Sequence, residues 1–171
     1  MKTIDAIRAR RSIRKYKPDA PVTQEQLDLL LEAAMLAPSA CNTRPWEFIV
    51  VRDRKILNEL TKIHTYAQML STAPLAIIVC ALPKTQEKDI SFGYYPQDCG
   101  AATQNILIQA VELGLGTCWC GVYPKENLMA TVKELLNIDK DSIPFNIIAV
   151  GVPDEAPKAR GSYDKNKVRY I

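Results

Sequence analysis

The 171 residues suffice for one domain with a sizeable core, and the composition, 47% hydrophobic and 24% charged, is typical of a globular protein. No apolar run reaches the roughly 18 residues of a membrane span, and arginines stand where a signal peptide would be apolar. The five cysteines are odd in number and lie mostly in apolar segments. This pattern predicts reduced thiols in a cytoplasmic protein rather than a disulfide framework.

Basic residues are concentrated near the N-terminus. Six lie within the ten positions from Arg8 to Lys17, although the whole chain carries only +3. Guanidinium groups with the hydroxyl of Ser12 among them suit a phosphate monoester, whereas a solvated basic face is the plainer interpretation. A second cluster, Lys158-Ala159-Arg160, follows the last predicted strand, so the two clusters could converge on one anion.

The first 45 residues predict two helices and a loop. Thr3 can cap a short helix that ends near Arg10. Thr23–Gln26 has the pattern of a capping box, and the apolar residues after it repeat with helical spacing until the helix must stop before Pro38. The residues from 39 to 45 form a polar loop of small side chains.

The rest of the chain alternates between predicted strands and helices. Four apolar segments are predicted strands: Trp46–Val51, Leu75–Ala81, Thr117–Val122 and Phe145–Val150. Helices are predicted at 57–63, 97–113 and 125–136. The helix at 97–113 is apolar on nearly every side, which indicates burial in the core or against a second subunit. The extended C-terminal arm, 154–171, ends in a fifth possible strand that is either frayed or paired with a distant element.

These elements predict one α+β domain over residues 1–171. Several other classes of site are disfavoured. Gly114-Leu115-Gly116 lacks the third glycine of a dinucleotide fingerprint. Cys118-x-Cys120 lacks the spacer of zinc and redox pairs, and both thiols would share one face of a strand. His64 is the only histidine, so a metal site is not expected, and a helix-end position explains this residue better than catalysis does.

Four groups of residues together resemble the nitroreductase family of FMN-dependent NAD(P)H oxidoreductases. They are Arg10–Arg14, Ala37–Trp46, Gly114–Gly121, and Gly151–Pro153 followed by Pro157–Arg160. The resemblance extends over essentially the whole chain, and its Pro38–Trp46 motif is quite specific. It implies a three-layer α/β/α sandwich around a mostly antiparallel sheet of about five strands. It also implies an intertwined homodimer that exchanges the C-terminal strand and binds two FMN molecules at its interface.

The resemblance assigns two sets of residues to the cofactor. Those that match the phosphate site are Arg10, Ser12, Lys158 and Arg160, with Arg11 contributing mainly through its backbone. Arg14 matches the cation beside flavin N1 and O2, where a guanidinium stabilises the reduced flavin more than the oxidised form. The residues that match the loop packed on the flavin from the other subunit are Pro38, Ser39, Ala40 and Asn42.

A third set matches the surroundings of the flavin ring. Trp119, Cys120 and Gly121 match a strand end whose backbone faces the ring edge, where an N–H can reach N5. Gln68 stands approximately where many relatives carry a lysine, and Arg44 stands where glutamine is common. A neutral residue at position 68 could lower the flavin potential. Both departures leave the substrate preference open.

The implied reaction is ping-pong electron transfer from NAD(P)H through FMN N5 to a nitroaromatic, a quinone or a similar acceptor. No side chain need act as an acid or base. Tyr66, Phe92 and Tyr95 are candidate pocket walls, and equally candidates for core or interface aromatics. The alternatives are dehalogenation, flavin cleavage or dehydrogenation on the same fold, and a flavin carrier or sensor. A nucleic-acid module is disfavoured because the basic excess is confined to two short clusters.

Overall fold

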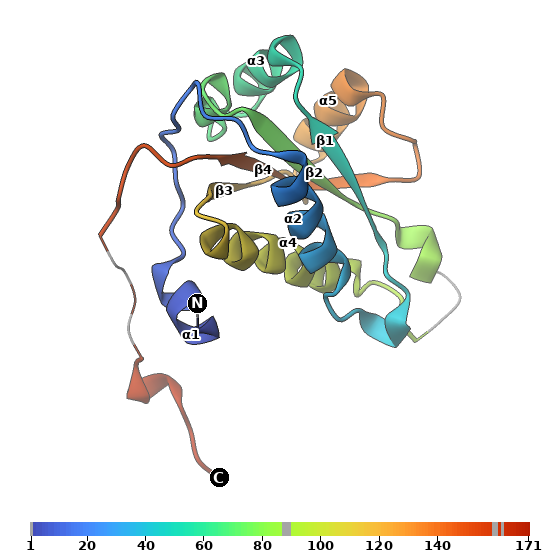
Figure 1. The fold of residues 1–171 in the computed structure, drawn as a ribbon. Helices are drawn as coiled ribbons and strands as arrows, with labels where there is room; N and C mark the ends of the chain where they lie inside the picture. The colour runs from blue at the N-terminus through green and yellow to red at the C-terminus, as the bar shows by residue number, and fades with distance from the viewer. Residues whose placement is uncertain (1, 87–89, 159–160, 162) are drawn as a thin grey trace.

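Helices cover both faces of a four-stranded antiparallel sheet in the computed structural model, which describes residues 2–86, 90–158, 161 and 163–171 (Figure 1). The strands lie in the order β1-β2-β4-β3, and their bounds are Trp46–Val51 (β1), Leu75–Ala81 (β2), Gly116–Gly121 (β3) and Ile143–Gly151 (β4). The α-helices are Thr3–Ala9 (α1), Gln24–Met35 (α2), Arg54–Ile63 (α3), Tyr95–Glu112 (α4) and Glu126–Leu136 (α5). Short 3-10 turns are Ala40–Asn42 (η1), Gln68–Ser71 (η2), Pro83–Gln86 (η3) and Lys165–Lys167 (η4). The predicted α/β/α sandwich is confirmed.

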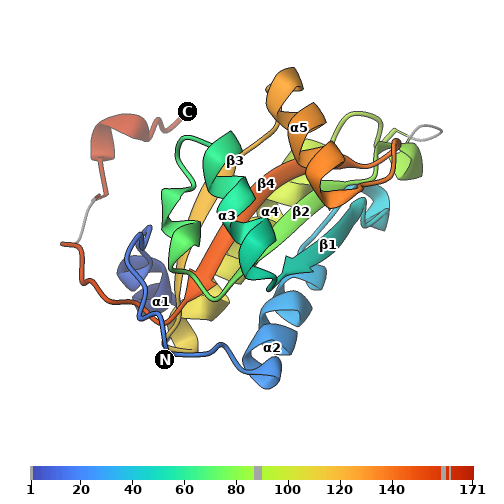
Figure 2. The ribbon, with the colours of Figure 1, turned by 90° about the horizontal axis from the view of Figure 1, so that it is seen from above.

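The sheet separates two cores because alternate side chains of a strand point to opposite faces. β2 is buried along its whole length. Ile78 packs with residues of α3 and α5, whereas Ile77 packs with residues of α2 and α4. Figure 2 shows α3 and α5 in front of the sheet and α4 behind it. None of the helices in the described residues is both long and apolar enough to cross a membrane.

Local signals set most helix starts. The capping box of α2 is confirmed: Gln26 N–H donates to Thr23 Oγ1 at 3.1 Å, and Thr23 N–H donates to Gln26 Oε1 at 3.0 Å. The prediction that Thr3 caps α1 is wrong, because Lys2 occupies the N-cap position and Thr3 is the first helical residue. At the end of α4, Gly114 adopts a φ of 69°, the left-handed conformation that commonly ends a helix.

The segment after α1 lies along the outer edge of β3 and then pairs with the chain that follows β4. Ile13 N–H donates to Thr117 O at 2.9 Å, and Asp154 N–H donates to Lys15 O at 2.9 Å. These bonds join residues more than a hundred positions apart. They bring the first basic cluster beside the beginning of the second.

Gly116 allows this close approach of the N-terminal segment to β3. A Cβ at this position would lie 2.9 Å from Cβ of Ile13, so Gly116→Ala should displace Ile13 and destabilise the protein by roughly 1–3 kcal/mol. Gly100→Ala is the control, because its Cβ would meet only the Trp119 ring at 3.9 Å and helices favour Ala over Gly. Thermal unfolding of both variants tests this prediction. Equal melting temperatures would contradict it.

The four predicted body strands are confirmed, but residues 163–171 add no fifth strand within this chain. They contain only η4, and the tail extends away from the body beyond α1 (Figure 1). Tyr163 and Tyr170 are largely exposed. Exchange of this segment between subunits stays a prediction.

Candidate functional site

Two hollows meet at Arg14, which lines both. One is a basic hollow of about 370 Å³, formed where the segment after α1 approaches the chain beyond β4. The other is a cleft of about 650 Å³ beside β3. The pair therefore forms a continuous surface with a strongly charged end and a largely aromatic end.

The basic hollow has the chemistry of an anion site. Its lining residues are Arg10, Arg11, Ser12, Arg14, Glu155, Pro157 and Lys158. Four cationic side chains thus face one carboxylate, and guanidinium and ammonium groups bind phosphate oxygens through charge-assisted hydrogen bonds. The predicted partner Arg160 lies outside the described residues, but Arg10 and Lys158 do line one hollow.

Two sets of contacts hold the walls of the basic hollow in place. The Arg11 guanidinium donates to Lys158 O at 3.2 Å and to Arg10 O at 2.5 Å. Glu155 Oε1 accepts from Arg14 N–H at 2.5 Å and from Lys15 N–H at 3.2 Å. The Arg11 side chain is therefore engaged in joining the two basic clusters. Glu155 fixes the backbone from which the Arg14 side chain extends.

The cleft lies along an open edge of the sheet. β3 is an edge strand, and peptide groups alternate in direction along a strand, so Thr117, Trp119 and Gly121 direct theirs away from β4. Thr117 O accepts from Ile13, and Gly121 O is 2.9 Å from Nε2 of His64. Among the described hydrogen bonds, the outward peptide groups of Trp119 have no such partner. A flat heterocycle with donors and acceptors on its rim could bind there.

His64 closes one end of the cleft. It caps the C-terminus of α3 and is 4% exposed, which confirms the predicted helix-end position. Tyr66 N–H donates to His64 Nδ1 at 3.2 Å, so the neutral ring carries its proton on Nε2 and donates it to Gly121 O. The histidine thus ties the η2 side of the cleft to the end of β3.

Cys118 and Cys120 lie on the same face of β3, as predicted, and both are buried. Cys120 Sγ donates to Tyr66 O at 3.2 Å. A hydrogen bond from Cys120 lowers the pKa of Cys118 to about 7, and Arg14 lowers it further against the opposing effect of burial. The same pairing and burial raise the pKa of Cys120. An acidic thiol therefore lies next to the cation that joins the two hollows.

The structure brings together most of the sequence-predicted residues. Those in the cleft are Tyr66, Gln68, Trp119, Cys120 and Gly121. Tyr95 packs edge-on against Tyr123, which lines the cleft, with ring centroids 5.9 Å apart. Phe92 is 71% exposed and lines none of the hollows described within this chain.

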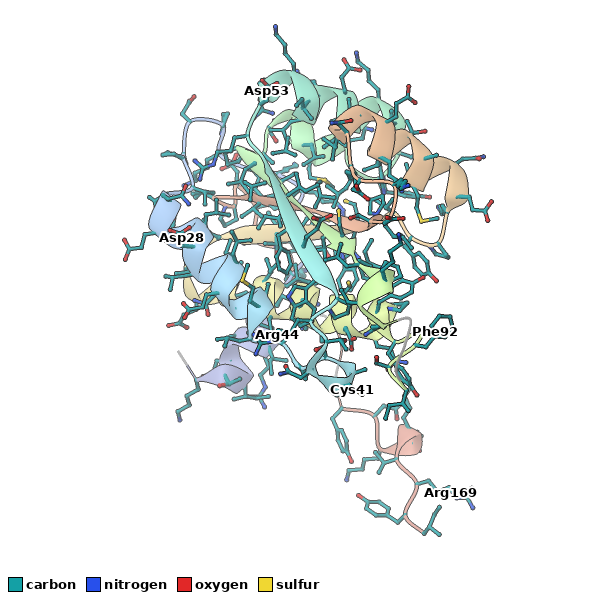
Figure 3. All side chains as sticks on the ribbon, turned by 90° about the vertical axis from the view of Figure 1, so that its right-hand side faces the viewer. Asp28, Cys41, Arg44, Asp53, Phe92 and Arg169 are labelled. Carbon is teal, nitrogen blue, oxygen red and sulfur yellow. The ribbon has the colours of Figure 1, made fainter. Side chains whose placement is uncertain are left out.

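The loop from Pro38 to Asn42 lies apart from the cleft. Pro38, Ser39 and Ala40 line a different hollow, of about 340 Å³, beside the start of α4. Asn42 is exposed in η1. Figure 3 shows Cys41 and Arg44 of this loop at the end of the molecule opposite Asp53. Within one chain, this set of predicted residues does not join the others.

Sequence reasoning missed part of the cleft wall. The additional lining residues are His64, Thr65, Met69, Cys118, Tyr123 and Lys125. Glu155 in the basic hollow was missed as well. A single carboxylate after the last strand has no pattern that distinguishes it from a surface residue. Tyr123 carried one usable signal, since it directly follows a predicted strand end.

Comparison with known proteins agrees with this arrangement. The model of the family described as "Nitroreductase family" matches residues 7–65 and 61–152. A protein of Methanothermobacter thermautotrophicus, provisionally named NADH dehydrogenase/NAD(P)H nitroreductase, is 44% identical over 168 residues, which are 98% of this chain and 86% of the relative.

Two crystal structures extend the comparison to the fold. An FMN-dependent nitroreductase of Clostridium difficile is 36% identical, with a TM-score of 0.87 over 98% of both chains. A nitroreductase of Desulfovibrio desulfuricans, provisionally so named and crystallised with FMN, is 29% identical, with a TM-score of 0.84 over 100% of this chain and 97% of that one. The family match covers most of the chain and the fold agrees along its length; the protein belongs to the nitroreductase family.

Proposed function

We propose that the protein is an FMN-dependent NAD(P)H oxidoreductase. The observation that carries this proposal is the junction at Arg14 of a phosphate-like anion hollow with a cleft on an open strand edge. FMN has the matching parts, a monophosphate at one end and a flat ring with hydrogen-bonding edges at the other. FMN in the D. desulfuricans relative and the names of the other relatives support the same cofactor.

Each part of the site has a distinct task. Arg10, Ser12 and Lys158 hold the phosphate by charge-assisted hydrogen bonds, with Arg160 as a further candidate from the family resemblance. Arg14 lies between the hollows, where its guanidinium stabilises negative charge on the pyrimidine side of the ring. The outward N–H of Trp119 is placed to meet the ring edge. The bound FMN supplies the redox chemistry, accepting a hydride from a reduced nicotinamide and returning electrons to an acceptor.

The site is completed by a second copy of the chain. The Pro38–Asn42 loop matches the family's cofactor loop, yet it lies away from the cleft of its own chain. A homodimer that places this loop over the partner's cleft resolves the conflict. The exposed tail and the partly exposed outer side of α4 also fit an interface between two copies.

The cleft favours a flat aromatic acceptor such as a nitroaromatic or a quinone. Tyr66, Trp119 and Tyr123 line it, together with Lys125 near its rim. Aromatic walls pack against planar substrates, and no carboxylate belongs to the described lining that would repel an electron-rich or anionic acceptor. Electrons from NAD(P)H and electrons to the acceptor then use the same face in alternation.

A spectrum of the purified protein tests the proposal. The protein should show flavin absorbance, and NADH or NADPH should bleach that absorbance in the absence of oxygen. Adding a quinone or nitroaromatic should restore it. Flavin absorbance that neither nucleotide bleaches would support a carrier instead, and a colourless protein that cannot be reconstituted with FMN would refute the assignment.

A further inference from the structure

We propose that Asp98 and Gln86 are positioning residues that hold the Pro38–Asn42 loop in the shape it needs to contact the cofactor of the partner subunit. This inference rests on the proposed function. Neither side chain lies in the basic hollow or the cleft. Both act through the loop.

Asp98 binds the loop directly. It lies in the first turn of α4 and is 6% exposed. Its Oδ1 accepts from Ala40 N–H at 3.1 Å, and its Oδ2 accepts from Gln86 Nε2 at 2.7 Å. A carboxylate is rarely buried to this degree unless it is paired or hydrogen-bonded. Here both oxygens have partners, and one partner is the backbone of the loop.

Gln86 closes the contacts into a ring. It is completely buried at the end of η3. Its Nε2 also donates to Thr43 Oγ1 at 3.0 Å, and Thr43 Oγ1 in turn donates to Ala40 O at 2.9 Å. The ring therefore holds both the N–H and the C=O of Ala40, using side chains from α4, η3 and the loop itself. Gln86 Oε1 has no hydrogen-bond partner among the described residues, so the amide is oriented by its donors.

The loop needs this support because its backbone is unfavourable. Cys41, Asn42 and Arg44 adopt φ values of 50°, 54° and 50°. Residues with a Cβ rarely adopt this left-handed conformation, and several in succession persist only when surrounding contacts impose them. Ser39 Oγ accepts from Arg44 N–H at 2.9 Å, which adds a bond within the loop. The ring with Asp98 and Gln86, in contrast, ties the loop to α4 and η3.

The test variant is Asp98→Asn. An amide at position 98 keeps the shape of the side chain but must direct a donor at either Ala40 N–H or Gln86 Nε2, both of which are donors. Hydrogen exchange at Ala40 should become faster, and the affinity for FMN should fall by about 10-fold or more. The double variant Asp98→Asn/Gln86→Glu places an acceptor opposite the new donor and should recover part of both losses.

Asp53→Ala is the control for a general loss of stability. Asp53 accepts from Lys55 N–H at 2.8 Å and from Ile56 N–H at 3.0 Å at the start of α3, at the far end of the molecule from the loop (Figure 3). This variant should lower the melting temperature without changing hydrogen exchange at Ala40 or FMN affinity.

The outcomes separate this inference from the proposed function. Unchanged exchange at Ala40 in Asp98→Asn would refute the support of the loop. Faster exchange with wild-type FMN affinity would refute its role in cofactor binding, as would an equal affinity loss in Asp53→Ala. A wild-type protein that binds no FMN would refute the proposed function and the cofactor part of this inference together, whereas the exchange measurement would still decide whether Asp98 holds the loop.

Discussion

Replacing Arg10 by Ala is expected to lower the affinity for FMN by about 10- to 100-fold. The guanidinium lines the basic hollow with Lys158, and a hydrogen bond to a charged group is worth about 1.5–3 kcal/mol. Titration of the apoprotein with FMN, followed by quenching of flavin fluorescence, measures the change. Riboflavin lacks the phosphate, so its affinity should be nearly the same for the variant and the wild type.

Arg8→Ala is the matched control for Arg10→Ala. Arg8 lies two residues earlier on α1, its side chain is 72% exposed, and it faces Asp5 at 4.0 Å rather than the hollow. An exposed ion pair of this kind contributes little, so FMN affinity should not change. If Arg8→Ala and Arg10→Ala weakened FMN equally, the effect would come from net charge and not from a phosphate site.

Mixed dimers provide the second large effect, a nearly all-or-none recovery of cofactor binding. Asn42→Pro should disrupt the loop, because proline cannot adopt the φ of 54° found there and removes the N–H that donates to Ser39 O at 3.0 Å. Homodimers of Asn42→Pro or Arg10→Ala should both bind FMN poorly. A dimer with one subunit of each kind should contain one site with both defects and one intact site.

Two affinity tags allow the mixed dimer to be isolated, and its flavin absorbance gives the FMN content. We expect about one FMN per mixed dimer, against two for the wild type, because the loop and the basic hollow of one site come from different subunits. If both parts of a site came from the same chain, every site would carry one defect and the mixed dimer would stay as empty as the homodimers. That result would exclude the shared site.

Much of the fold could be predicted from short-range patterns. The capping box at Thr23 and the fully apolar run Leu75–Ala81 each depend on neighbours within a few residues, and both are found as predicted. The same reasoning failed at Thr3, where the helix begins one residue earlier than its apparent cap suggests. Gly116, interpreted as part of a helix end, is instead the first residue of β3 and makes room for Ile13.

The candidate site was predictable only in part. The basic residues of 10–14 and Lys158 were identified from their charge and from family resemblance, and they line one hollow. His64 was correctly placed at a helix end, but its bond to Gly121 O could not be foreseen. Asp98 and Gln86 carry no sequence signal for their bonds to the loop, because an acidic residue in the first turn of a helix ordinarily serves the helix dipole.

The sequence by itself determined the class of the protein: an α+β chain of helices and apolar strands, a basic cluster suited to phosphate, and motifs of one family. These properties are encoded in residue type and spacing, which act over a few positions. Tertiary structure decided which edge of the sheet stays open, that Arg14 joins two hollows, and that the Pro38–Asn42 loop lies away from its own cleft. Those features depend on bonds such as Asp154 N–H to Lys15 O, which connect distant parts of the chain and exist only after it has folded.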